Sequence, residues 1–230
     1  MLQVRFLREA GVQPVPHIVA RQLASENELT WFAREAAVHF GVTRVLVIGG
    51  DQKEPTGPFK DAAAVIGSGI LSDAGIREVD IAGYPDGHPV IPDPVLLDDV
   101  HQKITLAAEQ ELALSIVTQF SFSADSIAEY CARLVAQDID LPVFAGLAGP
   151  TNPAQLLRYA KICGVSTSIK AANKLGWNAV KLAANTTPDK HLDILTGHFV
   201  GADAGNLAGI HIFSFGGFVK SAAWLADKAP

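Results

Sequence analysis

Several polar residues and glycines follow short apolar segments, and their types suit a flat, polar and partly anionic ligand. Asp51 comes directly after Gly49 and Gly50, and glycines allow backbone and carboxylate to approach the hydrogen-bonding edge of a ring. Tyr84 follows another apolar segment and can stack on an aromatic ring. Residues that can meet phosphate groups are His17, His88 and Lys103.

Each of these residues also has an ordinary structural interpretation. Asp51 can be the cap of the following helix, because aspartate often caps helix starts. His17 can be a core histidine whose nitrogens are hydrogen-bonded, and His88 can satisfy backbone groups of a solvated loop. Their shared occurrence at the ends of apolar segments favours a functional site. Gln119 has the same kind of position and is therefore a further candidate for that site.

Short apolar strands that alternate with helices must position these residues. The strands lack polar alternation, as expected when both faces of a parallel sheet are covered. The pattern predicts strands over residues 14–20, 44–48, 77–84, 114–119, 141–145, 164–169 and 208–213. It predicts helices over residues 2–10, 29–40, 62–74, 94–112, 124–137, 153–163, 187–203 and 219–227, with a helical, alanine-rich run after residue 169.

We expect an α/β fold that forms one domain over residues 1–230, a (β/α)8 TIM-type barrel. A doubly wound nucleotide fold would carry a GxGxxG turn after its first strand, which the sequence lacks. Barrel sites take residues from the carboxyl ends of many strands, which is the distribution here. The pattern yields six or seven strand-helix units, so one or two are missing. Either the chain lacks its first units or another subunit closes the gap, which predicts a homo-oligomer.

Composition excludes several other classes of function. The net charge is −6 and no basic cluster occurs, so we expect no nucleic-acid partner and no anionic membrane surface. No apolar run reaches a spanning length of about 18 residues, and the charged first residues differ from a secretory signal, so we expect a cytoplasmic protein. Cys131 and Cys163 lack zinc-ligand spacing, so we expect no metal site and no disulfide framework.

Six short motifs, in order and at their spacings, give the sequence a family resemblance. It resembles the methylenetetrahydrofolate reductases from about residue 11 to residue 225. Such enzymes are flavin-dependent and built on a (β/α)8 barrel. The motifs are PH at 16–17, GGD at 49–51, AGYPDGHP at 82–89, TQFSF at 118–122, GLAGP at 146–150 and IHIFSFGG at 210–217.

The resemblance implies an oxidoreductase of one-carbon metabolism. FAD would lie across the strand ends, NAD(P)H would reduce it, and 5,10-methylenetetrahydrofolate would take the hydride to become 5-methyltetrahydrofolate. Gln119 matches the glutamine that touches the pterin and the nicotinamide, and Asp51 matches the carboxylate that tunes the flavin. By the same resemblance, the FAD contacts are His17, Gly49, Gly50, Asp51, Tyr84, His88 and Lys103.

The sequence also departs from the family pattern. The catalytic glutamate of a Glu-Phe-Phe-Pro-like motif has no counterpart, and carboxylates such as Asp86 or Glu78 could in principle replace it as the acid. Gly49 stands where the family usually has arginine, and Gly216-Gly217 replaces an arginine that contacts folate. These departures leave a second hypothesis open: a non-catalytic or partner-dependent barrel fragment that binds flavin or folate without turnover.

Overall fold

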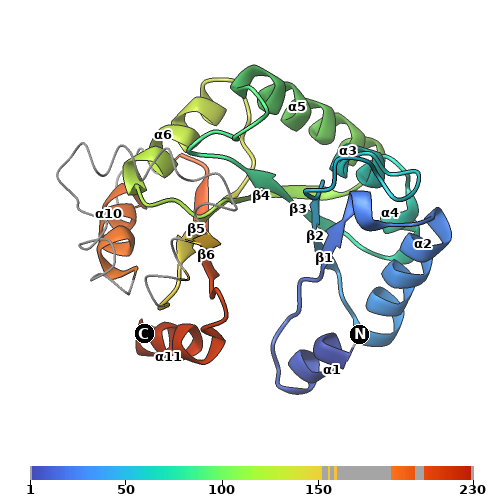
Figure 1. The fold of residues 1–230 in the computed structure, drawn as a ribbon, viewed down its shortest axis with the longest axis horizontal. Helices are drawn as coiled ribbons and strands as arrows, with labels where there is room; N and C mark the ends of the chain where they lie inside the picture. Colours follow the sequence, from blue (N-terminus) through green and yellow to red (C-terminus); the bar gives the residue numbers. More distant parts are fainter. Residues whose placement is uncertain (1, 152–154, 156–157, 160–187, 200–204, 229–230) are drawn as a thin grey trace. The chain divides into compact units, whose positions relative to one another are not determined.

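The computed structural model describes residues 2–151, 155, 158–159, 188–199 and 205–228. The chain forms two compact units, one of Met1–Ala82 with Pro94–Ile116 and the other of Gly83–Asp93 with Val117–Pro230. Strands alternate with helices in both units (Figure 1). The described strands, β1 to β6, follow one another in the sheet in chain order.

The first unit is built on parallel strands at the start of the sheet. β1 (His17–Val19), β2 (Arg44–Ile48) and β3 (Glu78–Gly83) pair in parallel, and β4 (Ala113–Thr118) begins in this unit. The register places His17, Leu46 and Asp80 in one row across the three strands. Its helices are α1 (Leu2–Glu9), η1 (Ala20–Gln22), α2 (Glu26–Arg34), η2 (Glu35–His39), α3 (Ala62–Ile66), α4 (Ile70–Ala74) and α5 (Asp93–Glu109).

Local sequence explains where these helices begin and end. Ser25 caps α2 by accepting a hydrogen bond from the Glu28 backbone, and the Glu28 carboxylate accepts one from the Ala24 backbone, a reciprocal capping box. The prediction of a single helix over residues 62–74 is wrong. This segment forms two helices, α3 and α4, because Gly69 adopts a left-handed φ of 75° just before Ile70.

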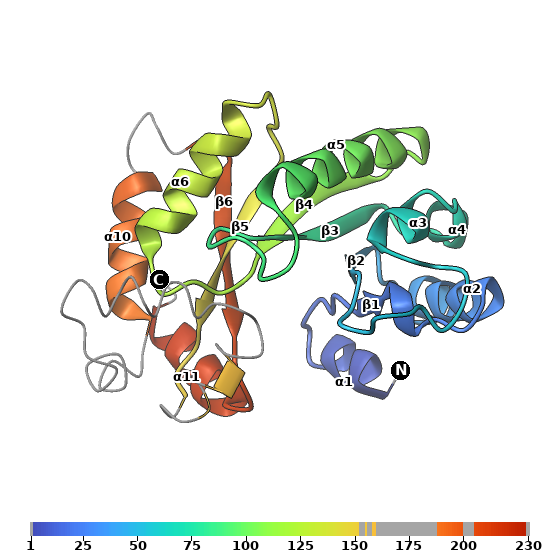
Figure 2. The same cartoon turned by 45° about the horizontal axis from the view of Figure 1, so that its top comes forward.

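In the part of the second unit that the structure describes, two parallel strands are accompanied by α6 (Ala124–Val135), α10 (Asp189–Phe199) and α11 (Phe218–Lys228). β5 (Val143–Ala148) and β6 (Leu207–Phe213) lie side by side in parallel (Figure 2). Gly146 is paired with His211, and the register shifts near Val143. α6 starts at its cap Ser123 and packs on α10. α11 follows β6.

The remaining differences from the predicted elements are shifts of boundaries. β1 is shorter than residues 14–20, and β5 continues to residue 148 instead of stopping at 145, because its pairing with β6 extends that far. Most of the helix predicted over 153–163, and all of the strand over 164–169 and the run after it, lie outside the described residues. The parallel strands alternating with helices confirm the predicted α/β class.

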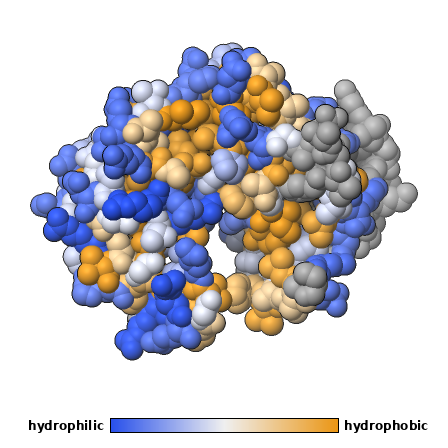
Figure 3. All heavy atoms as spheres, turned by 180° about the vertical axis from the view of Figure 1, so that it is seen from behind, coloured by the Kyte–Doolittle hydropathy of each residue, from blue (hydrophilic) through white to orange (hydrophobic). Residues whose placement is uncertain are grey.

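Both units bury apolar residues between strands and helices. The largest fully buried side chains include Leu29, Ile66 and Ile81 in the first unit and Phe120 and Ile127 in the second. On the face drawn in Figure 3, hydrophobic and hydrophilic residues are interspersed. Among the described residues, no helix is long and apolar enough to cross a membrane.

Candidate functional site

The Gly49-Gly50-Asp51 motif directly follows the last residue of β2. Gly50 has a φ of 97°, and a Cβ added there would lie 2.7 Å from Cγ1 of Val19. A Cβ added at Gly49 would meet no atom within 4 Å. The turn therefore requires glycine at position 50, where it packs against β1, but not at position 49.

The Asp51 side chain is exposed in this loop. Among the described residues, none donates a hydrogen bond to its carboxylate. The alternative in which Asp51 caps the next helix is wrong, because Asp61 is the cap of α3 and accepts from the Ala64 backbone at 2.8 Å. The Asp51 carboxylate is therefore open to a ligand.

Arg21 anchors the loop of residues 49–61 to η1. Its Nε donates to the carbonyl of Lys60 at 2.7 Å, and its Nη1 donates to the carbonyl of Gln52 at 2.8 Å. Its own carbonyl accepts from the Thr56 backbone at 2.8 Å. These long-range bonds fix the loop that carries Asp51.

His17 is the first residue of β1, not its middle residue as the sequence suggested. Its side chain shares a row of the sheet with Leu46 and the buried carboxylate of Asp80. Partial burial lowers the pKa of His17, and the Asp80 charge acts in the opposite direction. The imidazole is therefore biased toward its neutral form.

The turn of residues 84–88 follows β3 and fixes the tautomer of a second histidine, His88. The rings of Tyr84 and His88 meet edge to face with centroids 5.0 Å apart. Nδ1 of His88 accepts backbone hydrogen bonds at 3.2 and 3.1 Å from the two residues that follow Pro89. The proton of the neutral ring must then sit on Nε2, and burial lowers the pKa of His88. His88 thus presents a neutral N–H donor.

Gln119 directly follows β4, and the side chains of the residues before and after it point to the opposite face. Its backbone donates to the carbonyl of Gly83 at 2.7 Å, while Thr118 and Phe120 are fully buried. The Thr118 hydroxyl accepts from the Gly146 backbone at 2.8 Å. Because side chains alternate along extended chain, Gln119 lies on the opposite face and is half-buried.

Lys103 lies on the buried face of α5. It aligns with Val100 and Ala107, the other buried residues of that helix. Its ammonium forms a hydrogen-bonded ion pair with Asp99, one helical turn earlier. Lysine is rarely this buried without a partner, so the pair explains how the charge is tolerated.

An aromatic cluster in the second unit was not predicted. Phe120 is fully buried and packs edge to face on Phe122 and Phe215, while Tyr159 stacks on Phe215 with centroids 4.6 Å apart. Phe215 has a left-handed φ of 44°, unusual for a residue with a side chain. The available signal was the Phe-Ser-Phe triplet that follows β4 and recurs at the end of β6 from Phe213.

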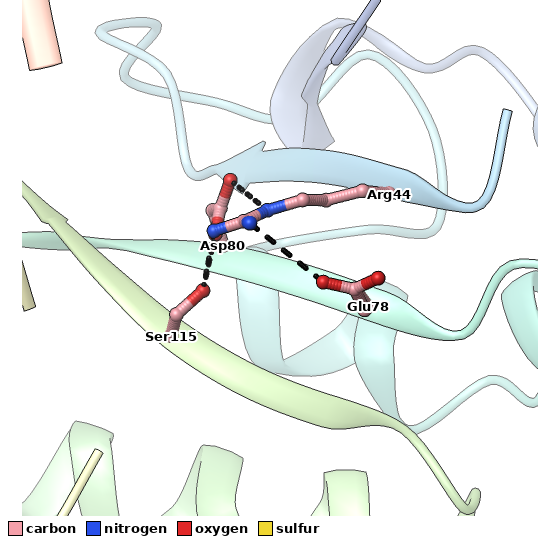
Figure 4. A network of polar contacts seen from close by, with 4 residues as sticks. All are labelled: Arg44, Glu78, Asp80 and Ser115. Carbon is pink, nitrogen blue, oxygen red and sulfur yellow. Dashed lines mark hydrogen bonds and ion pairs between the residues drawn. The ribbon is translucent and has the colours of Figure 1, made fainter. Parts of the chain in front are cut away.

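A polar network in the first unit was also missed (Figure 4). From β2, Arg44 reaches both carboxylate oxygens of Asp80 on β3, with Nε at 3.1 and 3.0 Å, and donates to Ser115 of β4 at 2.9 Å. Ser115 in turn donates to Asp80, and Glu78 lies 3.7 Å from Arg44. The Asp80 hydrogen bond raises the pKa of Arg44. The sequence does not reveal this network, because its members are far apart in the chain and lie on three different strands.

The predicted site residues are divided between the two units. In the described residues, no group of three or more His, Cys, Asp or Glu side chains is arranged to hold a metal ion. The first unit carries His17, Gly49, Gly50, Asp51 and Lys103, and the second carries Tyr84, His88 and Gln119.

Comparison with known proteins identifies the family. The family model described as methylenetetrahydrofolate reductase matches residues 2–179. The chain belongs to the methylenetetrahydrofolate reductase family. It is 27% identical over 167 residues to the 5,10-methylenetetrahydrofolate reductase of Pectobacterium carotovorum, covering 70% of this chain and 52% of the relative. It is 30% identical over 138 residues to methylenetetrahydrofolate reductase 2 of Saccharomyces cerevisiae, covering 56% and 22%.

The similarity to the Salmonella typhimurium 5,10-methylenetetrahydrofolate reductase is of the same kind, 25% identity over 157 residues, covering 67% of this chain and 50% of the relative. The chain thus spans about half the length of the bacterial relatives it matches. Family membership also accounts for the alternating parallel strands as part of a TIM-type barrel.

The family is generally flavin-dependent, and each unit, taken by itself, has side chains of the kinds that bind parts of a dinucleotide. The Lys103 ammonium has three N–H donors and one recorded acceptor, Asp99, so it retains donors for a phosphate oxygen. The His88 Nε2–H is a second donor, and Asp51 offers an acceptor to the N–H groups of a ring. The chain therefore offers both the hydrogen-bond donors and the hydrogen-bond acceptors that FAD requires.

Proposed function

We propose that the protein is an FAD-dependent oxidoreductase of one-carbon metabolism that uses NAD(P)H to reduce 5,10-methylenetetrahydrofolate to 5-methyltetrahydrofolate. When bound, FAD supplies the hydride relay between the two substrates. The proposal rests mainly on one observation. The family motifs of residues 49–51, 84–88 and 119 directly follow β2, β3 and β4, at the carboxyl ends where barrel enzymes carry their sites.

Each of these residues has a role that its geometry supports. Gly50 and the loop anchored by Arg21 would keep the Asp51 carboxylate available as an acceptor for the N–H groups of the flavin ring. His88 and Lys103, each in its own unit, would supply N–H donors for phosphate oxygens. Gln119, whose backbone is anchored to Gly83, orients the nicotinamide and the pterin in turn.

The proton that the folate nitrogen needs must come from an acid other than the family glutamate. Glu78 is poorly suited, because it starts β3 and pairs with Arg44. Asp86 fits better, because it lies in the turn after β3 and its Oδ2 is buried without a hydrogen-bond partner among the residues that the structure describes. We therefore propose Asp86 as the proton donor. Asp86→Asn should lower the rate of folate reduction and leave flavin reduction by NAD(P)H unchanged.

Purification followed by an absorbance scan tests the proposal. The protein should be yellow or take up added FAD, and it should oxidise NADH or NADPH when methylenetetrahydrofolate is present. A colourless protein that takes up no FAD and oxidises neither nucleotide would refute the proposed function.

A second candidate function is a partner-dependent fragment that keeps the cofactor pocket without turnover. It is favoured by the strand count, because the described sheet has six strands and ends at β1 and β6, where a closed barrel of this type has eight. Pairing of these edges with a second copy would make a homo-oligomer. Size-exclusion chromatography with light scattering tests this assembly, and a stable, cooperatively melting monomer would contradict it.

A further inference from the structure

The ion pair within α5 joins a buried ammonium to a partly exposed carboxylate, which distinguishes it from an ion pair on the surface. Lys103 has a side chain only 8% exposed, whereas its partner Asp99 is 35% exposed. The ammonium lies on the buried stripe of the helix and the carboxylate lies nearer to solvent. A buried ammonium that keeps unused N–H donors is costly unless a further acceptor reaches it.

Asp99 is the acceptor recorded for this ammonium in the described part of the chain. The order of the pair, acid four residues before base, is the favourable one on a helix. Any anion that binds Lys103 must therefore share its N–H groups with Asp99 and must approach a second negative charge at close range. Both effects weaken anion binding.

We propose that Asp99 is a built-in competitor for the anion site of Lys103, a residue that sets how tightly the protein holds the phosphate groups of its dinucleotide cofactor. The inference rests on the proposed function for the identity of that ligand. The chemistry itself requires only a diphosphate group. Asp99 acts through Lys103, so it is a positioning residue and not a catalytic one.

Asp99→Asn separates this role from a structural one, because asparagine keeps the size and the hydrogen-bonding oxygen but removes the charge. Asp98→Asn is the matched control, since Asp98 is its exposed neighbour on the same helix and the change in net charge is equal. The probes are FAD, followed by quenching of its fluorescence, and inorganic pyrophosphate, followed by calorimetry. Each is measured at low and at high salt.

At low salt, Asp99→Asn should bind both probes about five- to tenfold more tightly than the original protein, and the gain should shrink as salt rises. Asp98→Asn should bind as the original protein does. Adding Lys103→Met to Asp99→Asn should abolish the gain. If Asp99→Asn does not fold, as judged by its melting curve, Asp99→Ser replaces it.

Equal affinity of the Asp99 and Asp98 variants for pyrophosphate, or a gain that survives Lys103→Met, would overturn the inference. Failure of the proposed function has a different signature. In that case no variant binds FAD, while the pyrophosphate series still decides: tighter binding by the Asp99 variant supports the inference, and unchanged or undetectable binding refutes it.

Discussion

Both units have apolar cores, but each also contains one cluster of side chains beside its strands, and these two clusters have opposite chemistry. In the first unit, Arg44, Asp80 and Ser115 join three neighbouring strands through charged hydrogen bonds. In the second, Phe120 and Phe215 lead a cluster of aromatic rings around the ends of β4 and β6. The same kind of strand-helix unit can therefore add either a polar or an aromatic filling to its apolar core.

This difference determines how each unit responds to substitution. A buried charged network depends on every partner, because removing one leaves another buried and unpaired. An aromatic cluster depends on area and fit, so its loss scales with the volume removed. The following predictions compare the two fillings by the size of their effects on the free energy of unfolding.

Asp80→Ala should have the largest effect, about 4 kcal/mol, because it leaves the Arg44 guanidinium without its main partner. Glu78→Gln is the control and should cost less than about 1 kcal/mol, because Glu78 is half-exposed and 3.7 Å from Arg44. Urea denaturation measures both. Similar costs for the two variants would show that the network is not the main support of this unit.

Phe120→Ala should cost about 3 kcal/mol, because it opens a cavity at a fully buried ring. Phe122→Ala, which removes a half-buried ring packed on it, should cost about 1 kcal/mol. The ratio of the two costs in urea denaturation tests whether Phe120 is the centre of the cluster. A smaller cost for Phe120→Ala than for Phe122→Ala would place the centre elsewhere.

Gly50→Ala should cost about 2 kcal/mol, since its φ of 97° disfavours a side chain and the new Cβ would press on Val19. Gly49→Arg, which restores the residue usual in the family, should change stability by less than about 0.5 kcal/mol because the position is open. Thermal melting compares the two. An equally large loss at position 49 would contradict the open geometry.

The sequence predicted most of the alternating elements and the positions of Asp51, Tyr84 and Gln119 after strands, because apolar periodicity and glycine turns are local signals. It could not predict the Arg44–Asp80–Ser115 network, since those residues are brought together only by strand register. It also could not tell Asp51 from a helix cap, a question that the Asp61 cap of α3 answers. The single helix over residues 62–74 failed because the left-handed turn at Gly69 outweighed a continuous apolar pattern.

Acid should destabilise the protein modestly. Burial lowers the pKa of His88 below its ordinary value of 6.5, so the unfolded chain binds a proton more readily. The stability from the neutral ring is therefore complete above pH 6.5 and is lost as the pH falls through the lower, folded-state pKa. His88→Asn keeps an acceptor for the backbone but does not titrate, so its melting temperature should fall less between pH 7.5 and 5.5.

The exposed His101 provides the control for this pH experiment. His101→Gln should retain the pH dependence of the original protein. An unchanged pH dependence in His88→Asn would show that proton binding by His88 does not contribute.

Separate measurement of the two half-reactions tests the central claim most directly. Under anaerobic conditions, NADH or NADPH should bleach the 450-nm absorbance band of the FAD-loaded protein, roughly where enzyme-bound flavins absorb. Methylenetetrahydrofolate should then restore that band. Asp51→Asn should still bind FAD but change the rates of both steps. A flavin that neither nicotinamide nucleotide reduces, or that methylenetetrahydrofolate does not reoxidise, would contradict the account.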